Sequence, residues 1–189
     1  MVAIRAARVR RICQRPDASD RADWQAGRMD IAIRRGTSAD ARAAADLWLH
    51  ARAAAGSAIP PPAHPPHEVR DWFATHVVPD CELWLAETPD GALAGILVLD
   101  GTWLEQLYVE PGLKGRGIGA QLVAFAQERS PGGLRLWTFV SNERAQRFYE
   151  RWGFEEVERT DGHDNEERSP DILYAWSGAG TATAPAEPR

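Results

Sequence analysis

One stretch of this sequence, residues 103–120, restricts the fold more than any other. An apolar run over 103–109 predicts a β-strand, and the apolar pattern over 118–129 predicts a helix soon after it. The loop and the first helical turn carry three alternating glycines: Gly115, Gly117 and Gly119. Glycine adopts positive φ at little cost and lets the backbone approach a ligand, while the first turn of a helix offers N–H groups without internal partners. The stretch therefore predicts a pocket for a phosphate or a pyrophosphate.

Two positive side chains stand at the rim of this pocket. Lys114 and Arg116 flank Gly115, and Lys114 is the only lysine of the chain. Backbone N–H groups of residues 115–120 would hold the anion, and the two cations would neutralise part of its charge. The question left open by the loop is which molecule carries the phosphate.

The overall composition is that of a soluble α/β protein. A chain of 189 residues fits one such domain, and its net charge of −5 argues against a general nucleic-acid surface. No apolar run approaches the ~20 residues that cross a bilayer. Cys13 and Cys81 lack metal-ligand spacing, and their scarcity is consistent with a reducing, cytoplasmic location. His64 and His67 have no third ligand nearby, so no metal site is predicted.

The two ends of the chain differ from the middle. Residues 1–28 hold seven arginines and three aspartates, with few apolar residues at any regular period. A transit peptide is one interpretation of this composition, and a disordered extension before Met29 is the preferred one. Residues 178–189 are rich in Ala, Gly, Pro and Thr and are expected to be disordered. The folded domain is therefore expected over 29–177.

Hydrophobic periodicity and turn residues divide this domain into strands and helices. Strands are predicted over 31–35, 82–88, 91–99, 103–109, 134–140, 154–160 and 172–176. Helices are predicted over 37–55, 67–78, 118–129 and from the capping residue Asn142 to Gly153. The run 134–140 is almost continuously apolar, which favours a central strand covered on both faces. A proline-rich loop over 56–66 separates the first two helices, which are expected to form a lid.

The context of the glycine loop argues against two nucleotide-binding folds. Residues 115–120 fit the dinucleotide fingerprint, but that loop should follow the first strand of its fold. Here at least four predicted strands precede the loop, and only about 70 residues follow it. The mononucleotide pattern GxxxxGK[ST] is absent from the sequence.

Two segments carry a resemblance to a known family. Residues 107–119, Leu-Tyr-Val-Glu-Pro-Gly-Leu-Lys-Gly-Arg-Gly-Ile-Gly, resemble the acyl-CoA motif of the GCN5-related N-acetyltransferases (GNAT). Residues 142–154, Asn-Glu-Arg-Ala-Gln-Arg-Phe-Tyr-Glu-Arg-Trp-Gly-Phe, are similar to the family's second motif. The resemblance covers about 29–177, and Lys114 departs from it by standing where the family usually has Gln or Arg. It implies an α/β (α+β) acyl-CoA N-acyltransferase fold, with a mixed, mostly antiparallel central sheet of about seven strands and four helices, splayed beside strand 103–109.

The resemblance implies acetyl-CoA (coenzyme A) as the cofactor, inserted in that splay. The cofactor arm would pair with the backbone of 107–109 as an added strand would, and the glycine loop would hold the pyrophosphate. Asn142 caps a helix and is expected also to touch the cofactor arm. The expected cofactor-binding residues are Leu107, Tyr108, Val109, Lys114, Gly115, Arg116, Gly117, Ile118, Gly119, Ala120, Asn142 and Tyr149.

Two residues are candidates for catalysis. Tyr149 matches the family's usual proton donor to the leaving thiolate, and its alternative role is a core residue packed with Phe148 and Trp152. Glu105 lies in the cofactor strand and is the candidate base, acting directly or through water. Partial burial would raise its pKa toward a useful range, whereas a solvent-facing glutamate at a strand edge is the alternative.

The acceptor side is expected at the last hairpin. Eight acidic residues lie between 155 and 171, and an acidic rim there would attract a cationic amine, although a solvated acidic hairpin is the alternative. The candidate substrate-binding residues are His163, Asn165, Glu166, Glu167 and Asp171.

These observations predict a cytoplasmic acetyltransferase that acts on a primary amine. The acceptor is expected to be a small cationic molecule, which attacks acetyl-CoA directly without a covalent enzyme intermediate. One alternative is a protein or peptide acetyltransferase for lysine or N-terminal amines, against which the proline-rich lid argues. Another is a non-catalytic acyl-CoA-binding regulator. No nucleic-acid or membrane partner is expected, and a homodimer stays open because such folds are often dimeric.

Overall fold

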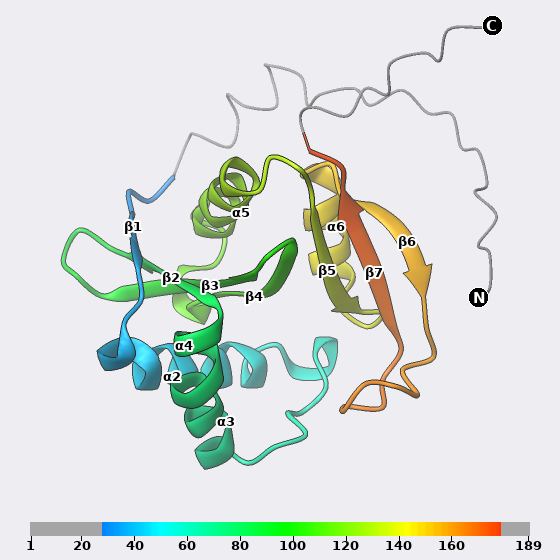
Figure 1. The fold of residues 1–189 in the computed structure, drawn as a ribbon, viewed down its shortest axis with the longest axis horizontal. Helices are drawn as coiled ribbons and strands as arrows, with labels where there is room; N and C mark the ends of the chain where they lie inside the picture. Colours follow the sequence, from blue (N-terminus) through cyan, green and yellow to red (C-terminus); the bar gives the residue numbers. More distant parts are fainter. Residues whose placement is uncertain (1–27, 179–189) are drawn as a thin grey trace, which may run out of the picture.

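The structure, a computed structural model, describes residues 28–178 and is built around one seven-stranded sheet (Figure 1). The strands are β1 (Ala32–Arg35), β2 (Glu82–Glu87), β3 (Leu93–Asp100), β4 (Trp103–Val109), β5 (Leu134–Phe139), β6 (Glu155–Arg159) and β7 (Asp171–Trp176). Their order is β1-β2-β3-β4-β5-β7-β6, and every neighbouring pair is antiparallel except β4 with β5. The predicted mixed, mostly antiparallel sheet is confirmed.

Four helical segments surround the sheet in the part of the chain that the structure describes. They are α2 (Ala41–Ala53), a continuous helix over 66–80, α5 (Ile118–Arg129) and α6 (Glu143–Arg151). The helix over 66–80 consists of α3 (Pro66–Trp72), a π-helical segment (Phe73–Val77) and α4 (Val78–Asp80). Pro79 gives a reason for the wider turn, because its ring would clash with the carbonyl group four residues earlier in a regular α-helix. Short 3₁₀ turns occupy Ser38–Asp40, Gly56–Ala58 and Pro111–Leu113.

The strands β4 and β5 are parallel neighbours that barely pair. Their register joins them at one position, Trp103 with Arg135. By contrast, β3 pairs with β4 along its length, from Asp100↔Trp103 to Gly95↔Val109. Beyond Trp103 the two parallel strands diverge, so one edge of β4 is open toward its C-terminal end. The splay predicted beside strand 103–109 is present.

Hydrophobic clusters fill both faces of the sheet around β3. On one face, α2 and the helix over 66–80 pack on a cluster that includes Ile96 and Val98 (Figure 1). On the other face, α5 and α6 pack on a cluster that includes Leu97 and Leu99. Because successive side chains of a strand point to opposite faces, β3 is buried on both.

The strand predicted to be covered on both faces, 134–140, has one open face instead. Leu134 and Leu136 of β5 are buried, whereas Arg135 and Trp137 are exposed, Trp137 by 44%. Among the described helices, α6 covers one face of β5 and none covers the other (Figure 1). The prediction was wrong because an apolar residue was taken as a buried one, while Trp137 stands on the wall of a cleft.

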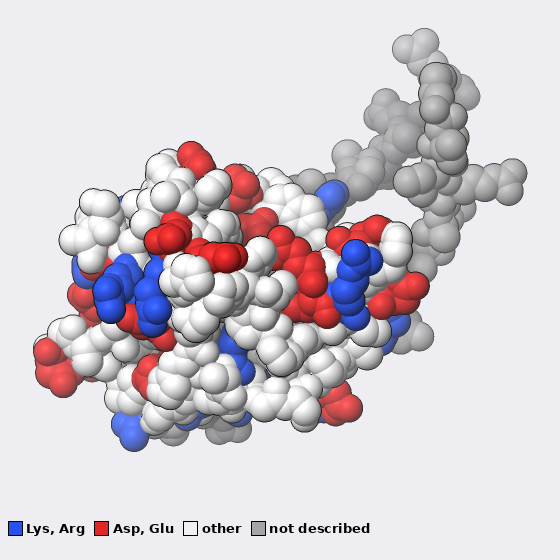
Figure 2. All heavy atoms as spheres, turned by 90° about the horizontal axis from the view of Figure 1, so that it is seen from below, with Lys and Arg blue, Asp and Glu red and all other residues white. Residues whose placement is uncertain are grey.

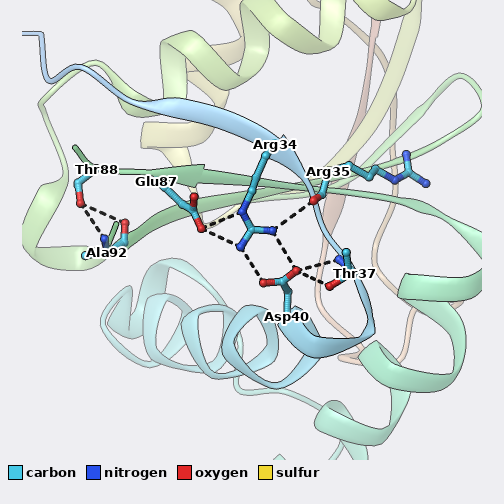
Figure 3. A network of polar contacts seen from close by, with 7 residues as sticks. All are labelled: Arg34, Arg35, Thr37, Asp40, Glu87, Thr88 and Ala92. Atoms are coloured by element: carbon cyan, nitrogen blue, oxygen red, sulfur yellow. Dashed lines mark hydrogen bonds and ion pairs between the residues drawn. The ribbon is translucent and has the colours of Figure 1, made fainter. Parts of the chain in front are cut away.

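A polar network fastens β1 and β2 to the start of α2 (Figure 3). The Arg34 guanidinium donates to the two Asp40 carboxylate oxygens at 2.8 and 3.0 Å, and to Glu87 at 2.9 Å. Asp40 also accepts from the backbone and the hydroxyl of Thr37 at 2.9 and 2.8 Å. These hydrogen bonds hold the pKa of Asp40 well below its usual range, and the hydrogen bond from Arg34 has the largest effect. The network sets where α2, one wall of the cleft, leaves the sheet.

The predicted disordered ends, apart from Arg28 and Gly178, lie outside the described residues. Within residues 28–178, no helix is both long enough and apolar enough to cross a membrane.

Candidate active site

The glycine loop has the backbone geometry that its sequence predicts. Gly115 and Gly117 have φ of +84° and +75°, in the left-handed region where a residue with a Cβ is strained. Gly117 is the N-cap of α5, and no side chain of the described residues caps this helix end. The N–H groups of the first turn of α5 can therefore bind an anion. Lys114 and Arg116 are exposed on the loop, and desolvation together with the positive charge of Arg144 lowers the pKa of Lys114.

The free edge of β4 lies beside this loop. Leu107, Tyr108 and Val109 pair with β3 on one edge, while β5 has already diverged from the other. Gly119 of α5 faces this region, since a Cβ there would lie 3.7 Å from Val109 and 3.6 Å from Phe148. An extended ligand arm can add to the open edge as an extra strand would. The residues predicted to bind the cofactor are thus brought together around the splay.

The helix α6 places Asn142 and Tyr149 on the other side of the splay. The Asn142 side chain accepts from a first-turn backbone N–H at 3.2 Å, which confirms it as the N-cap. Tyr149 is buried, with ring centroids 5.3 Å from Phe148 and 5.5 Å from Phe154. Burial, and to a lesser degree Tyr108, raises the pKa of Tyr149. The phenol therefore stays protonated at neutral pH, as a proton donor must, but it is a weak acid that needs a well-positioned acceptor.

Glu105 lies at a β-bulge of β4. The β3–β4 register shifts at this point, which leaves Glu105 without a partner on β3. The side chain is exposed, yet it lines the large cleft described below. The cleft walls desolvate the carboxylate and Asp100 adds a negative charge, and both raise the pKa of Glu105. A carboxylate in this position is suited to accept a proton from a substrate or a water molecule.

A cleft of about 940 Å³ lies between α2, the helix over 66–80, β4, β5 and the loop between β6 and β7. Its size suits an organic ligand of ordinary dimensions. Trp72 and Trp137, which are 38% and 44% exposed, provide aromatic surface on its walls. The cleft reaches Glu105 and Tyr108, so it meets β4 beside the open edge.

The wall of the cleft is strongly acidic. Among the described residues that line it, eight are carboxylates: Glu68, Asp71, Glu105, Glu158, Asp164, Glu166, Glu167 and Asp171. Arg52 is the single Lys or Arg in the same lining. Figure 2 shows acidic side chains gathered across the middle of the face seen from the α3 side. This charge favours a cationic ligand.

Some of these carboxylates are already paired across the cleft. Arg52 Nη2 donates to Glu167 at 2.7 Å, and the two side chains are 6% and 16% exposed. His64 lies 2.9 Å from Glu68 through Nδ1 and 3.4 Å from Glu166 through Nε2. The hydrogen bond to Glu68, followed by the charge of Glu166, raises the pKa of His64. These contacts tie α2 and the proline-rich loop to the loop between β6 and β7.

Aromatic rings enclose the Arg52 guanidinium. Its Cζ lies 4.5 Å from the Trp48 ring centre and 5.8 Å from that of Phe139. Trp48 also contacts Tyr108 at 5.9 Å between ring centroids. Arg52 Nε is buried and has no hydrogen-bond partner within the described part of the chain. Arg52 is thus part of a packed wall.

The residues predicted to bind the substrate fall into different roles in the structure. Four of them line the cleft: Asn165, Glu166, Glu167 and Asp171. His163 points elsewhere, with a side chain 71% exposed beside Asp164. Asp171 accepts from the Thr160 hydroxyl and, at 2.9 Å, from Asn165. Asp171 and Asn165 therefore hold the shape of the loop, while Glu166 and Glu167 pair with the opposite wall.

Known proteins are similar to this chain in both sequence and fold. A family profile described as Acetyltransferase (GNAT) domain matches residues 79–156. The peptidyl-lysine N-acetyltransferase YjaB of Salmonella typhimurium is 33% identical over 89 residues, which cover 46% of this chain and 59% of that protein. YjaB of Escherichia coli is 31% identical over 104 residues, which cover 54% of this chain and 69% of that protein. The chain belongs to the GNAT acetyltransferase family.

The GNAT assignment agrees with a solved structure. The solution structure of apo-form YjaB from Escherichia coli matches with a TM-score of 0.65 and 26% identity, over 80% of this chain and 100% of that one. Family membership confirms the predicted fold, and the acetyltransferases of this family use acetyl-CoA as the acyl donor. The aligned region spans only 59% of the Salmonella protein. The roles of individual residues stay predictions.

The sequence patterns did not predict the residues that α2, α3 and β5 contribute to the cleft. Trp72 shares an apolar helical pattern with Val69 and Phe73, but these two are buried and Trp72 faces the cleft. The i, i+4 spacing of Val69 and Phe73 could have separated it from the core-facing residues. Arg52 stands four residues after Trp48 in an alanine-rich helix, so the two side chains lie on one helix face. This spacing could have predicted a cation on the buried face of that helix.

Proposed function

We propose that this GNAT protein transfers an acetyl group from acetyl-CoA to the primary amine of a small, cationic acceptor. The observation that carries the proposal is the meeting of two features at β4. The strand has an open edge at Leu107–Val109 beside the glycine loop, and its bulged Glu105 lines the acidic, aromatic cleft. A donor on the open edge and an amine in the cleft would thus meet at one strand.

The reaction needs a deprotonated amine and a protonated leaving group. Glu105, directly or through water, takes a proton as the amine nitrogen bonds to the thioester carbon. The carbon–sulfur bond then breaks, and Tyr149 gives its phenolic proton to the thiolate. Solvent returns a proton to Tyr149 and accepts one from Glu105, so the enzyme ends in its starting state. The raised pKa of Glu105 and the protonated state of Tyr149 support these roles.

The acidic wall supports a cationic acceptor, and two contacts support a small one. The Arg52–Glu167 and His64–Glu166 pairs connect the proline-rich loop and α2 to the β6–β7 loop. Segments joined in this way leave less room for an extended polypeptide than an open groove would. Trp137 adds an exposed ring that suits a cation by its π face.

A peptidyl-lysine acceptor is the second candidate. The YjaB proteins of Salmonella and Escherichia coli are named peptidyl-lysine N-acetyltransferases. A lysine side chain is itself a primary amine on an apolar stem, which the aromatic and acidic walls could hold. The two candidates differ in whether the main chain beside the amine adds to binding.

The deciding experiment measures thiol release from acetyl-CoA with a panel of acceptors. The panel contains polyamines, monoamines, free lysine and lysine-containing peptides of matched charge. We expect the highest kcat/KM for small amines with two or more positive charges. A higher kcat/KM for lysine peptides than for every small amine would favour the second candidate. Tight CoA binding without release for any acceptor would instead support a non-catalytic acyl-CoA-binding protein.

A further inference from the structure

The segment before β1 crosses the start of α5, the helix that follows the glycine loop. Met29 N donates to Arg116 O at 3.0 Å, which joins this segment to the middle of the glycine loop. The Arg28 guanidinium donates to Gln121 Oε1 at 2.6 Å, and Gln121 Nε2 donates to Met29 O at 3.0 Å. The two contacts of Gln121 connect residues more than ninety positions apart in the sequence.

The side chain of Gln121 holds the segment before β1 against α5. This side chain lies in the first turn of α5 and is buried, with 8% exposure, so its amide needs hydrogen-bond partners. The partners are Arg28, the Met29 carbonyl and, at 3.4 Å, the Gly117 carbonyl. One buried amide therefore joins the segment before β1 to the left-handed glycine that starts the helix.

Arg28 also brings positive charge to the loop. Its Cγ lies 3.5 Å from the position that a Cβ on Gly117 would take, and its side chain is exposed. Lys114 and Arg116 belong to the same loop, and the first turn of a helix carries a partial positive charge. Charges of one sign gathered here favour the arrival of a polyanion, whose phosphates would offset their mutual repulsion.

We propose that Arg28 is a positioning residue for the phosphates of acetyl-CoA, a role that rests on the proposed function. It acts in two ways. Through Gln121 and Met29 it holds Gly117 in the conformation that presents the first-turn N–H groups, and its charge strengthens the field on the pyrophosphate. The effect falls on the phosphates alone, because the segment contacts the loop and not the acceptor cleft.

The test compares Arg28→Gln with the unaltered chain for donors with and without phosphates. We expect about a three- to tenfold weaker CoA affinity by calorimetry, as for loss of one charge beside an anion site. The KM for acetyl-CoA should rise by the same factor, while kcat and the KM for acetyl-pantetheine, which lacks phosphates, stay unchanged. Arg28→Lys should restore most of the affinity. Arg42→Gln is the matched control, because this exposed arginine lies on α2, away from the loop.

A second variant tests the route through Gln121. Gln121→Met should weaken CoA binding as Arg28→Gln does, and the double variant should be no weaker than the stronger single one, since both break one connection. Equal affinities of Arg28→Gln and the unaltered chain, or equal losses for acetyl-CoA and acetyl-pantetheine, would overturn the inference and leave the proposed function standing. Tighter binding by Arg28→Gln would mean that the segment obstructs the loop, which also overturns it. Failure of the unaltered chain to bind CoA would overturn both.

Discussion

The proposed donor and acceptor sides of this GNAT protein are assembled in opposite ways. The donor side is nearly contiguous, since β4, the glycine loop and the start of α5 follow one another between Trp103 and Gln121. The acceptor side joins distant segments, and its Arg52–Glu167 pair links residues 115 positions apart. Local backbone geometry therefore shapes the donor site, whereas the acceptor cleft depends on tertiary contacts. The two sides should respond differently to substitution.

The largest effect is expected where the acceptor wall depends on a buried ion pair. Arg52→Met removes a cation that is 6% exposed and leaves Glu167 without its partner. We expect the free energy of unfolding to fall by about 3 kcal/mol, measured by urea denaturation. Arg147→Met breaks the exposed Arg147–Glu143 pair on α6 and should change stability little. Similar costs for both variants would show that the buried pair does not hold the cleft together.

The second largest effect is expected for the proton transfer proposed for Tyr149. Tyr149→Phe keeps the ring that packs on Phe148 and Phe154 but removes the proposed proton donor. We expect kcat to fall by about 10²-fold while the CoA dissociation constant stays unchanged. Tyr174→Phe is the control, because this buried tyrosine donates its hydroxyl hydrogen bond to Glu150 instead. An unchanged kcat for Tyr149→Phe would assign Tyr149 to the core alone.

The donor side should be sensitive to backbone strain. Gly117→Ala places a Cβ on a residue with φ of +75°, which disfavours the conformation that starts α5. We expect CoA to bind about tenfold more weakly, as measured by calorimetry. Gly91→Ala meets the same conformational strain at φ of +84° in the β2–β3 turn, with open space around it. It should lower stability and leave CoA affinity unchanged. Equal CoA affinities for both variants would separate the loop from cofactor binding.

The smallest effect is expected at the exposed His64 contacts. The pKa of His64 is raised in the folded protein by Glu68 and Glu166. The stabilisation of the folded protein by these contacts is therefore fully present below the unfolded pKa of about 6.5. That stabilisation is lost as pH rises through the folded pKa. Relative to His64→Gln, the melting temperature of the unaltered chain should fall by about one degree between pH 6 and pH 8. A pH-independent difference would show that the histidine does not link the two loops.

Sequence patterns predicted most strands and helices because turn residues and caps mark their ends. The predicted bounds of β4 and α5 coincide with the structure, and Asn142 begins α6 as its cap. The same patterns did not distinguish buried from exposed apolar residues. Trp72 lies in an apolar helical pattern and Trp137 in an apolar strand, yet both face the cleft. Whether an apolar side chain is covered depends on what packs over it, which periodicity within one element does not contain.

The acidic segment after β6 shows the same limit from the polar side. The sequence shows its excess of carboxylates. It does not show that Glu167 pairs with Arg52 of α2 and that Glu166 pairs with His64 in the loop before α3. Asn165 of this segment hydrogen-bonds to Asp171 at the start of β7 and to Ser169, so these contacts fix the shape of the segment.

The sequence alone predicted the proposed donor side, because glycines with positive φ, a helix start and the preceding strand lie within one continuous segment. Local sterics and unpaired helix-end N–H groups are properties of such a segment, so its chemistry can be inferred without a fold. Only the tertiary structure decided the acceptor cleft, the pairing of Glu166 and Glu167, and the contact of Arg28 with Gln121. Each of these brings together residues far apart in the chain, and their proximity depends on the sheet order and on the divergence of β4 and β5.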